Sequence, residues 1–182
     1  YPLGPLTEDE KRFYTWTLQS HIDLAKAVWL DYCECKMIDT IAREPLWRHL
    51  INYRCGTGHS VSFVGNVHEG PHALNSRNTT RMRPGMVVTD EPGVYETDLV
   101  GIRIENELVC VHKADNQYGT FLGFEPLMFV PIATSPILPG VLDKDEIAWL
   151  NDYHRQVFAK LAPHLNDEER SWLAEKCAAI GC

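Results

Sequence analysis

The chain has 182 residues, enough for one domain with a sizeable core, and 45% of them are hydrophobic. It contains 25 acidic residues against 17 lysines and arginines, which gives a formal net charge of −8. This balance argues against a nucleic-acid-binding protein, which needs a basic surface, and favours basic partners or substrates. No apolar stretch approaches the roughly 20 residues needed to cross a bilayer, so we expect no membrane segment.

The first residues indicate whether the chain is part of a longer protein, and the cysteines indicate its redox compartment. The chain starts with Tyr1-Pro-Leu-Gly-Pro rather than methionine, a sequence typical of the interior of a longer protein, so we expect an upstream segment. Six irregularly spaced cysteines do not form a disulfide framework and indicate reduced thiols in a cytoplasmic protein. Cys33 and Cys35 are a candidate redox or metal pair. Two thiols in a turn is the favoured interpretation, because no second Cys/His pair lies at zinc-site spacing.

Two helices are predicted near the start of the chain. Thr7 and Glu10 have the spacing of a capping box, which marks a helix N-terminus. The apolar residues that follow recur at spacings of 4, 4, 3 and 4, which places them on one helical face. They are Tyr14, Leu18, Ile22, Ala25 and Trp29. A second helix is predicted over residues 37–51, with a kink or restart at Pro45.

The sequence pattern changes over residues 55–132, where glycines, prolines and short β-rich runs replace helical periodicity. Strands are predicted at residues 86–89 and 127–130, and a polar loop at residues 75–83. Ile102 and Ile104 alternate with Arg103 and Glu105, so this strand should have one apolar and one charged face.

Two further helices are predicted near the end of the chain. Asp143 and Glu146 mark an acidic helix start, Pro163 should end that helix, and Asn166 should cap the last one. Helices therefore flank a β-rich middle, and no internal repeat or linker interrupts the chain. We predict a single α+β domain over residues 1–182.

Three segments in the β-rich region carry ionisable groups next to glycines. They contain His59, Glu91 and Glu105, which are one imidazole and two carboxylates from separate strands. This combination suits a divalent metal ion. Taken singly, each has an ordinary explanation: a satisfied histidine, a turn glutamate, and an ion pair of Glu105 with Arg103. The combination in this order is far more specific.

The same segments resemble a known family. The runs His59 to Pro71, Met86 to Gly93 and Gly101 to Asn106 resemble the pita-bread metallopeptidases of the methionine aminopeptidase and prolidase superfamily. Asn-Val-His-Glu-Gly-Pro, Asp-Glu-Pro-Gly and Gly-Ile-Arg-Ile-Glu-Asn are most similar to Xaa-Pro aminopeptidases. The resemblance covers nearly the whole chain. It implies the C-terminal part of a pita-bread (creatinase/aminopeptidase-like) catalytic domain, with helices flanking a curved, mostly antiparallel sheet.

The resemblance also implies a metal centre and residue roles. Family members hold two divalent ions, often manganese, with zinc or cobalt as alternatives, on five ligands: Asp, Asp, His, Glu and Glu. His59, Glu91 and Glu105 match the last three. Glu91 is expected to act as general base on a metal-activated water, and His68 to contact substrate and assist proton transfer. Arg103 is expected to support the ligand carboxylates.

Two departures from the family pattern qualify these expectations. The two Asp ligands, expected just before the first helix, have no counterpart, so we expect at most one bound ion and an incomplete domain. Cys55 stands where the family has a histidine that shapes the pocket, which indicates either altered specificity or relaxed constraint.

Two functions follow as hypotheses. The first is a hydrolase that removes the N-terminal residue of peptides with proline second, inactive in this chain without the rest of the domain. The alternative is a non-catalytic pita-bread module that binds peptides or proteins, as in histone-chaperone subunits. An exposed sheet edge would also favour a homodimer.

Overall fold

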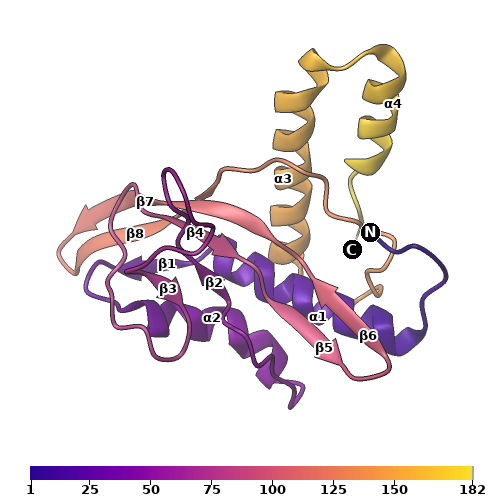
Figure 1. Ribbon diagram of the computed structural model, residues 1–182. Coiled ribbons are helices and arrows are strands. Elements are labelled where there is room, and N and C mark those ends of the chain that lie inside the picture. The colour runs from indigo at the N-terminus through magenta and orange to yellow at the C-terminus, as the bar shows by residue number, and fades with distance from the viewer. Residues whose placement is uncertain (182) are drawn as a thin grey trace. The chain divides into compact units, whose positions relative to one another are not determined.

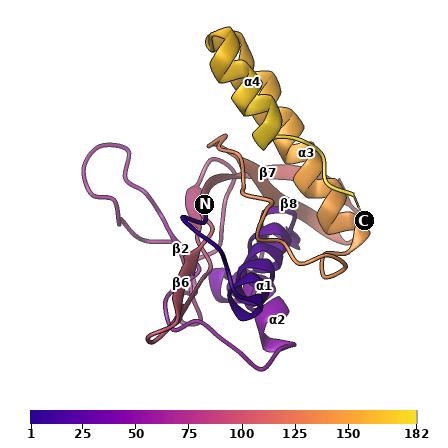
Figure 2. The same ribbon diagram turned by 90° about the vertical axis from the view of Figure 1, so that its right-hand side faces the viewer.

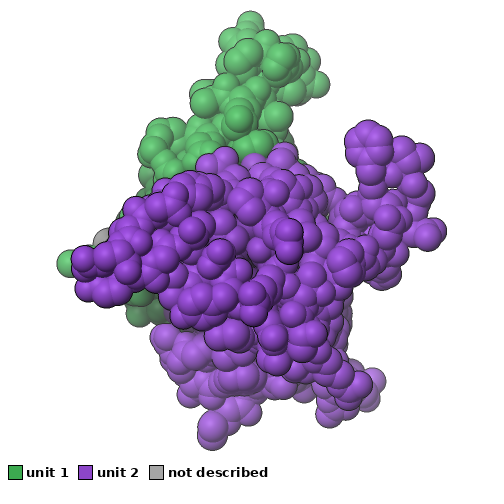
Figure 3. All heavy atoms as spheres, turned by 90° about the vertical axis from the view of Figure 1, so that its left-hand side faces the viewer, with its two compact units in different colours: residues 1–15, 129–182 green, residues 16–128 purple. Residues whose placement is uncertain are grey.

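The computed structural model describes residues 1–181. The chain forms two compact units, which Figure 3 distinguishes by colour. Unit 1 comprises residues 1–15 and 129–182, and unit 2 comprises residues 16–128.

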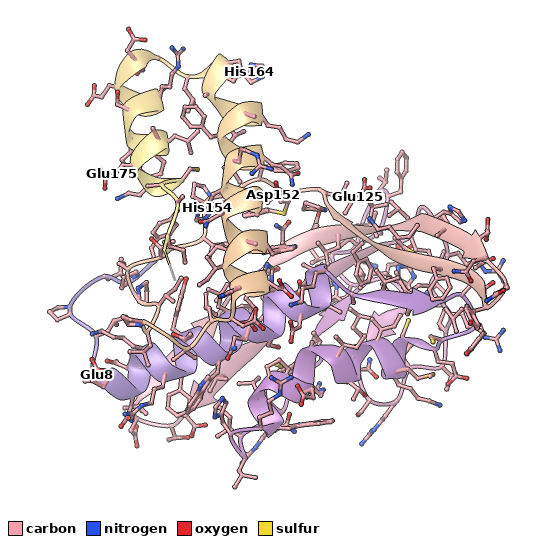
Figure 4. The ribbon with its side chains drawn as sticks, turned by 180° about the vertical axis from the view of Figure 1, so that it is seen from behind. Glu8, Glu125, Asp152, His154, His164 and Glu175 are labelled. Atoms are coloured by element: carbon pink, nitrogen blue, oxygen red, sulfur yellow. The ribbon has the colours of Figure 1, made fainter. Side chains whose placement is uncertain are left out.

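The main sheet of unit 2 has four antiparallel strands in the order β1-β8-β7-β4 (Figure 1). They are β1 (Val28–Leu30), β4 (Val87–Asp90), β7 (Asn106–Asn116) and β8 (Gly119–Pro126). Inward-facing Val88, Leu108, Leu122 and Phe124 are buried along these strands. Helix α2 (Cys35–Trp47) lies below the long strands β7 and β8 in the views of Figures 1 and 4.

Two short hairpins lie beside this sheet. One pairs β2 (Gly58–His59) with β3 (Ala73–Leu74), and the other pairs β5 (Gly93–Glu96) with β6 (Val100–Arg103). The loop from residue 60 to residue 72, between β2 and β3, extends outward in Figure 2. At Gly58 a Cβ atom would lie 1.7 Å from the carbonyl oxygen of Thr89, so only glycine allows β2 to approach β4 this closely.

Helix α1 (Glu8–Ala25) begins as predicted. The Thr7 backbone N–H donates to Glu10 at 2.7 Å, and the Glu10 N–H donates back to the Thr7 hydroxyl at 3.3 Å. The predicted extension of this helical face to Trp29 is wrong. The helix ends at Ala25, and Trp29 lies in β1, where its ring packs 4.6 Å from that of Phe124. An apolar strand residue at a helical spacing therefore mimicked one more helical turn.

Unit 1 contains α3 (Lys144–Leu161), a 3₁₀ turn (Ala162–His164) and α4 (Asp167–Lys176). Asp143 and Asn166 each form a complete capping box, and Pro163 lies in the 3₁₀ turn that follows α3, so the predicted helix boundaries are confirmed. Tyr153, Val157 and Leu173 form the core of this unit.

The strand predicted at residues 127–130 is wrong. β8 ends at Pro126, and the next residues are irregular. The backbone N–H and C=O of Val130 both hydrogen-bond the Tyr153 hydroxyl, at 3.2 and 3.0 Å, and Phe129 packs on the α3–α4 core. A side chain thus replaces the strand partner that the apolar run suggested.

The alternation predicted for residues 102–105 is confirmed. Ile102 and Ile104 are buried while Arg103 and Glu105 are exposed, as the alternation required. The five cysteines within the described residues are all free thiols. Burial raises the pKa of Cys110 to about 11, which makes this thiol unreactive. No helix among residues 1–181 is long and apolar enough to cross a membrane.

Candidate active site

His59 and Glu91 meet at the centre of the candidate site. His59 ends β2, and Glu91 follows β4, whose edge is joined to the β2 segment by a bridge between Ser60 and Val88. The His59 Nε2 atom lies 3.0 Å from Glu91 Oε1. The Glu91 side chain is about 10% exposed and that of His59 21%, so the pair opens to solvent mainly through the imidazole.

Thr89 fixes both members of this pair. Its hydroxyl accepts from the His59 backbone N–H at 3.0 Å and donates to Glu91 Oε1 at 2.8 Å. A third bond runs from the Glu91 backbone N–H to the Thr57 carbonyl at 2.8 Å. The sequence motifs did not point to Thr89. The available signal was its spacing, because residues i and i+2 of a strand lie on the same face.

Arg103 lies against the other oxygen of the glutamate. Its guanidinium donates to Glu91 Oε2, and its Nε donates to the Tyr95 hydroxyl at 2.7 Å. The β5–β6 register pairs Gly93 with Arg103, so Tyr95 is the diagonal neighbour of that arginine. Arg103 therefore contacts the Glu91 carboxylate, while its role as the support of a metal ligand stays a prediction. The motifs did not point to Tyr95.

Glu105 is not brought into this group. It is exposed, and within residues 1–181 no three His, Cys, Asp or Glu side chains are placed to hold one metal ion. Glu105 lies close enough to Asp90 to contribute, with Glu91, to a raised pKa of that carboxyl. Burial is the main cause of this raised pKa, and His21 opposes it from 3.1 Å.

His68 and Cys55 line the same cavity as His59 and Glu91. The imidazole of His68, from the β2–β3 loop, stands edge-on to that of His59, with ring centroids 3.8 Å apart. Both rings border a cavity of about 380 Å³ that is also lined by Cys55, Glu91 and Arg103. Five of the six predicted site residues therefore lie around one cavity, and Glu105 lies outside its lining.

The donor set fits a divalent cation. His59 Nδ1 lies 3.1 Å from the Ser60 carbonyl, which can only accept a hydrogen bond, so a neutral imidazole with its proton on Nδ1 would keep the Nε2 lone pair for a metal ion. Metal-binding histidines are commonly oriented by such a backbone contact. The 3.0 Å between Nε2 and Oε1 also equals the separation of two ligand atoms about 2.1 Å from one ion at a right angle. His59 and Glu91 are therefore compatible with neighbouring positions on one ion.

Comparison with known proteins identifies the family. The model of metallopeptidase family M24 matches residues 1–112, and that of the C-terminal region of peptidase M24 matches residues 120–180. The chain belongs to metallopeptidase family M24.

Named relatives are Xaa-Pro-type aminopeptidases. Aminopeptidase P1 of Lotus japonicus is 39% identical over 98% of this chain and 28% of its own length. Aminopeptidase P2 of Arabidopsis thaliana is 43% identical over 90% of this chain and 24% of its own length. This chain thus spans less than a third of the relatives that it matches.

A solved structure gives the same assignment. X-prolyl aminopeptidase from Caenorhabditis elegans, described as a cytosolic enzyme with a di-nuclear active site, matches with a TM-score of 0.90 at 37% identity. The match covers 98% of this chain and 30% of that one. The predicted α+β class and pita-bread fold are confirmed.

Proposed function

We propose that this chain supplies part of the catalytic centre of a metal-dependent Xaa-Pro aminopeptidase, which removes the N-terminal residue before proline. The observation that carries the proposal is the His59–Glu91 pair, 3.0 Å apart, at a cavity bordered by a second histidine and an arginine. Membership of family M24 and the similarity to aminopeptidases P support the same reaction class.

Each side chain has a distinct role in this proposal. In this proposal His59, Glu91 and Glu105 would hold divalent metal, manganese by the family pattern, which when bound activates water and polarises the scissile carbonyl. Glu91 accepts the proton of the attacking water, since Thr89 and Arg103 hold its carboxylate in a fixed orientation. His68, in the cavity lining beside His59, binds the substrate and assists proton transfer to the leaving amine.

The remaining features of the proposal follow from the family pattern. The two Asp ligands come from a part of the domain outside these 182 residues, and Glu105 completes its contact only with that part in place. The isolated chain holds at most one ion and is inactive. We further propose a cytoplasmic location and homodimer formation through the exposed sheet edge.

A peptidase assay tests this proposal. The purified chain with added manganese should not hydrolyse Ala-Pro peptides. When mixed with the preceding part of the domain, taken from an aminopeptidase P relative, it should gain turnover. Glu91→Gln should then reduce kcat at least about 100-fold, as expected for loss of a general base. The control Glu96→Gln should leave kcat unchanged. Turnover by the isolated chain would contradict the inactivity, and a fully active Glu91→Gln complex would contradict the assigned base.

The alternative is a peptide- or protein-binding module without catalysis. Two observations favour it: Glu105 lies outside the cavity lining, and Cys55 replaces an expected histidine. Manganese titration of wild type against Glu105→Ala, in the complex with the preceding part of the domain, separates the two functions. Tight binding that the variant weakens supports the enzyme. Peptide binding without manganese binding supports the module.

A further inference from the structure

A second cavity adjoins the candidate active site. It measures about 750 Å³ and shares Cys55, Gly56 and Asn75 with the lining of the active-site cavity. Because the two cavities share lining residues, an extended peptide that occupies the first can continue into the second. If the first cavity holds the N-terminal residues of a substrate, the second receives the part that follows proline.

The lining of the second cavity carries positive charge, whereas the whole chain is negatively charged. Three arginines line it, Arg43, Arg54 and Arg77, and no Asp or Glu does, although the chain carries a net charge of −8. Asparagines and Trp47 make up much of the remaining wall. An electropositive cavity next to a peptide site selects for negatively charged groups.

Arg43 forms the rigid wall of this cavity. It is 7% exposed, and its guanidinium donates to Asp39 at 2.7 Å and to the carbonyls of Tyr53 and Cys55 at 2.9 and 2.8 Å. All its donor nitrogens are thus in use within the fold. Since these carbonyls flank Arg54, the contacts of Arg43 fix the backbone that presents Arg54.

Arg54 and Arg77 differ from Arg43 in their exposure and in their contacts. Both are exposed, and neither forms an ion pair with a carboxylate within residues 1–181. Glu96 shares a smaller neighbouring cavity with Arg54, yet the two side chains make no ion pair. Arg77 is held in position by a turn in which its backbone N–H donates to Asn75 at 3.0 Å. Two unpaired guanidinium groups therefore border one cavity from separate segments.

We propose that this cavity binds a carboxylate of the peptide substrate downstream of proline, through Arg54 and Arg77. Guanidinium groups bind carboxylates through paired, charge-assisted hydrogen bonds, which makes arginine the suitable residue. The carboxylate comes from an acidic side chain or from the C-terminus of a short peptide. The inference rests on the proposed function, because it takes the neighbouring cavity to hold the N-terminal Xaa-Pro residues.

Peptide binding to the chain tests the inference without requiring catalysis. The probes are Ala-Pro-Gln amide, which has no carboxylate, Ala-Pro-Gln free acid, Ala-Pro-Glu amide and Ala-Ala-Glu amide. Dissociation constants are measured by calorimetry, or by the fluorescence of Trp47 in the cavity wall. Arg54→Gln and Arg77→Gln are compared with Arg83→Gln, an exposed arginine outside the cavity that removes the same charge.

A carboxylate peptide should bind more tightly than Ala-Pro-Gln amide, and Arg54→Gln or Arg77→Gln should each weaken that binding about three- to tenfold. Arg83→Gln should change it less than twofold. Preference for the free acid assigns the C-terminus as the source of the carboxylate, and preference for Ala-Pro-Glu amide assigns the side chain. Equal binding of all peptides, no detectable binding at millimolar concentration, or equal effects of all three variants would overturn the inference.

The same measurements separate this inference from the proposed function. If Ala-Ala-Glu amide binds as well as Ala-Pro-Glu amide while Arg54→Gln still weakens both, the cavity binds carboxylates but proline recognition fails. If proline preference persists and the arginine variants bind normally, the aminopeptidase proposal stands and the carboxylate site does not.

Discussion

The two units differ in what they bury. Unit 2 buries several charged or titratable side chains next to its candidate site, whereas the described part of unit 1 packs mainly apolar residues and buries few such groups. The buried histidine, arginine, aspartate and glutamate residues of unit 2 are His21, Asp39, Arg43, His72, Asp90 and Glu91. Those of unit 1, within the described residues, are Glu146 and His154. Buried ionisable groups need partners, so unit 2 depends on specific contacts and unit 1 on packing volume.

The largest effect on stability is expected for Arg43→Met. This change leaves Asp39, which is 1% exposed, buried without its ion-pair partner, and it removes the donors to Tyr53 and Cys55. Breaking such a buried pair costs about 3–5 kcal/mol. Urea unfolding followed by tryptophan fluorescence measures the free energy of unfolding.

Arg48→Met is the matched control. Arg48 also pairs with a carboxylate four residues earlier, Glu44, but these two side chains are 62% and 47% exposed. An exposed pair of this kind contributes at most about 1 kcal/mol. Equal losses for Arg43→Met and Arg48→Met would contradict the view that burial makes the Asp39–Arg43 pair essential.

The next largest loss of stability is expected in unit 1. Leu173 is the buried residue of α4 and packs in the core with Tyr153 and Val157. Leu173→Ala should lower the free energy of unfolding by about 2–4 kcal/mol, through lost burial and the cavity left behind. Trp172→Ala alters the adjacent residue, whose side chain is 52% exposed, and should cost much less. A larger loss from Trp172→Ala would show that the core of α4 has been assigned to the wrong face.

A smaller loss of stability, but a direct effect on the site, is expected for Gly58→Ala. The added Cβ would lie 1.7 Å from the Thr89 carbonyl, so β2 must move away from β4. We expect a cost of about 1–3 kcal/mol and separation of His59 from Glu91, visible as a changed His59 imidazole signal in NMR spectra. Gly56→Ala, whose Cβ would make its nearest contact at 3.4 Å, should leave that signal unchanged. An unchanged His59 signal in Gly58→Ala would refute the proposed strand contact.

The sequence predicted local structure better than strand pairing. Capping at Thr7, Asp143 and Asn166 depends on residues three apart, so these helix starts were predicted and are confirmed. The β7–β8 hairpin was missed because strand pairing depends on the register between two strands, and the composition of each strand does not reveal that register. Trp29 and Val130 were misassigned because an apolar residue does not reveal whether it packs in a helix, in a strand or against a tyrosine hydroxyl.

The candidate site was likewise predicted only in part. His59, Glu91, His68, Arg103 and Cys55 were selected from motifs, and the fold brings them to one cavity. The motifs did not reveal Thr89 or Tyr95, because hydroxyl groups in this role are recognised by the atoms they contact. The ligand role of Glu105 stays a prediction.

The smallest effect is a pH dependence expected in unit 1. His154 on α3, labelled in Figure 4, is fully buried, and its Nε2 accepts from the Ile132 N–H at 3.0 Å. Burial lowers the pKa of His154 below its ordinary value. The unfolded chain therefore takes up a proton first, near pH 6.5, so stability present above that pH is lost as the pH falls towards the folded pKa. This loss amounts to at most about 1.4 kcal/mol per pH unit.

His154→Gln should remove this dependence, because glutamine keeps an acceptor for Ile132 and does not titrate. Urea unfolding at pH 7.5, 6.5 and 5.5 should show the difference between wild type and variant shrinking as the pH falls. His164→Gln changes an exposed histidine just beyond the same helix and should follow the pH curve of wild type. Parallel curves for wild type and His154→Gln would mean that the buried imidazole does not titrate on unfolding in this range. The stability of unit 1 would then not depend on protonation of His154, and any loss of stability in acid would come from other groups in the chain.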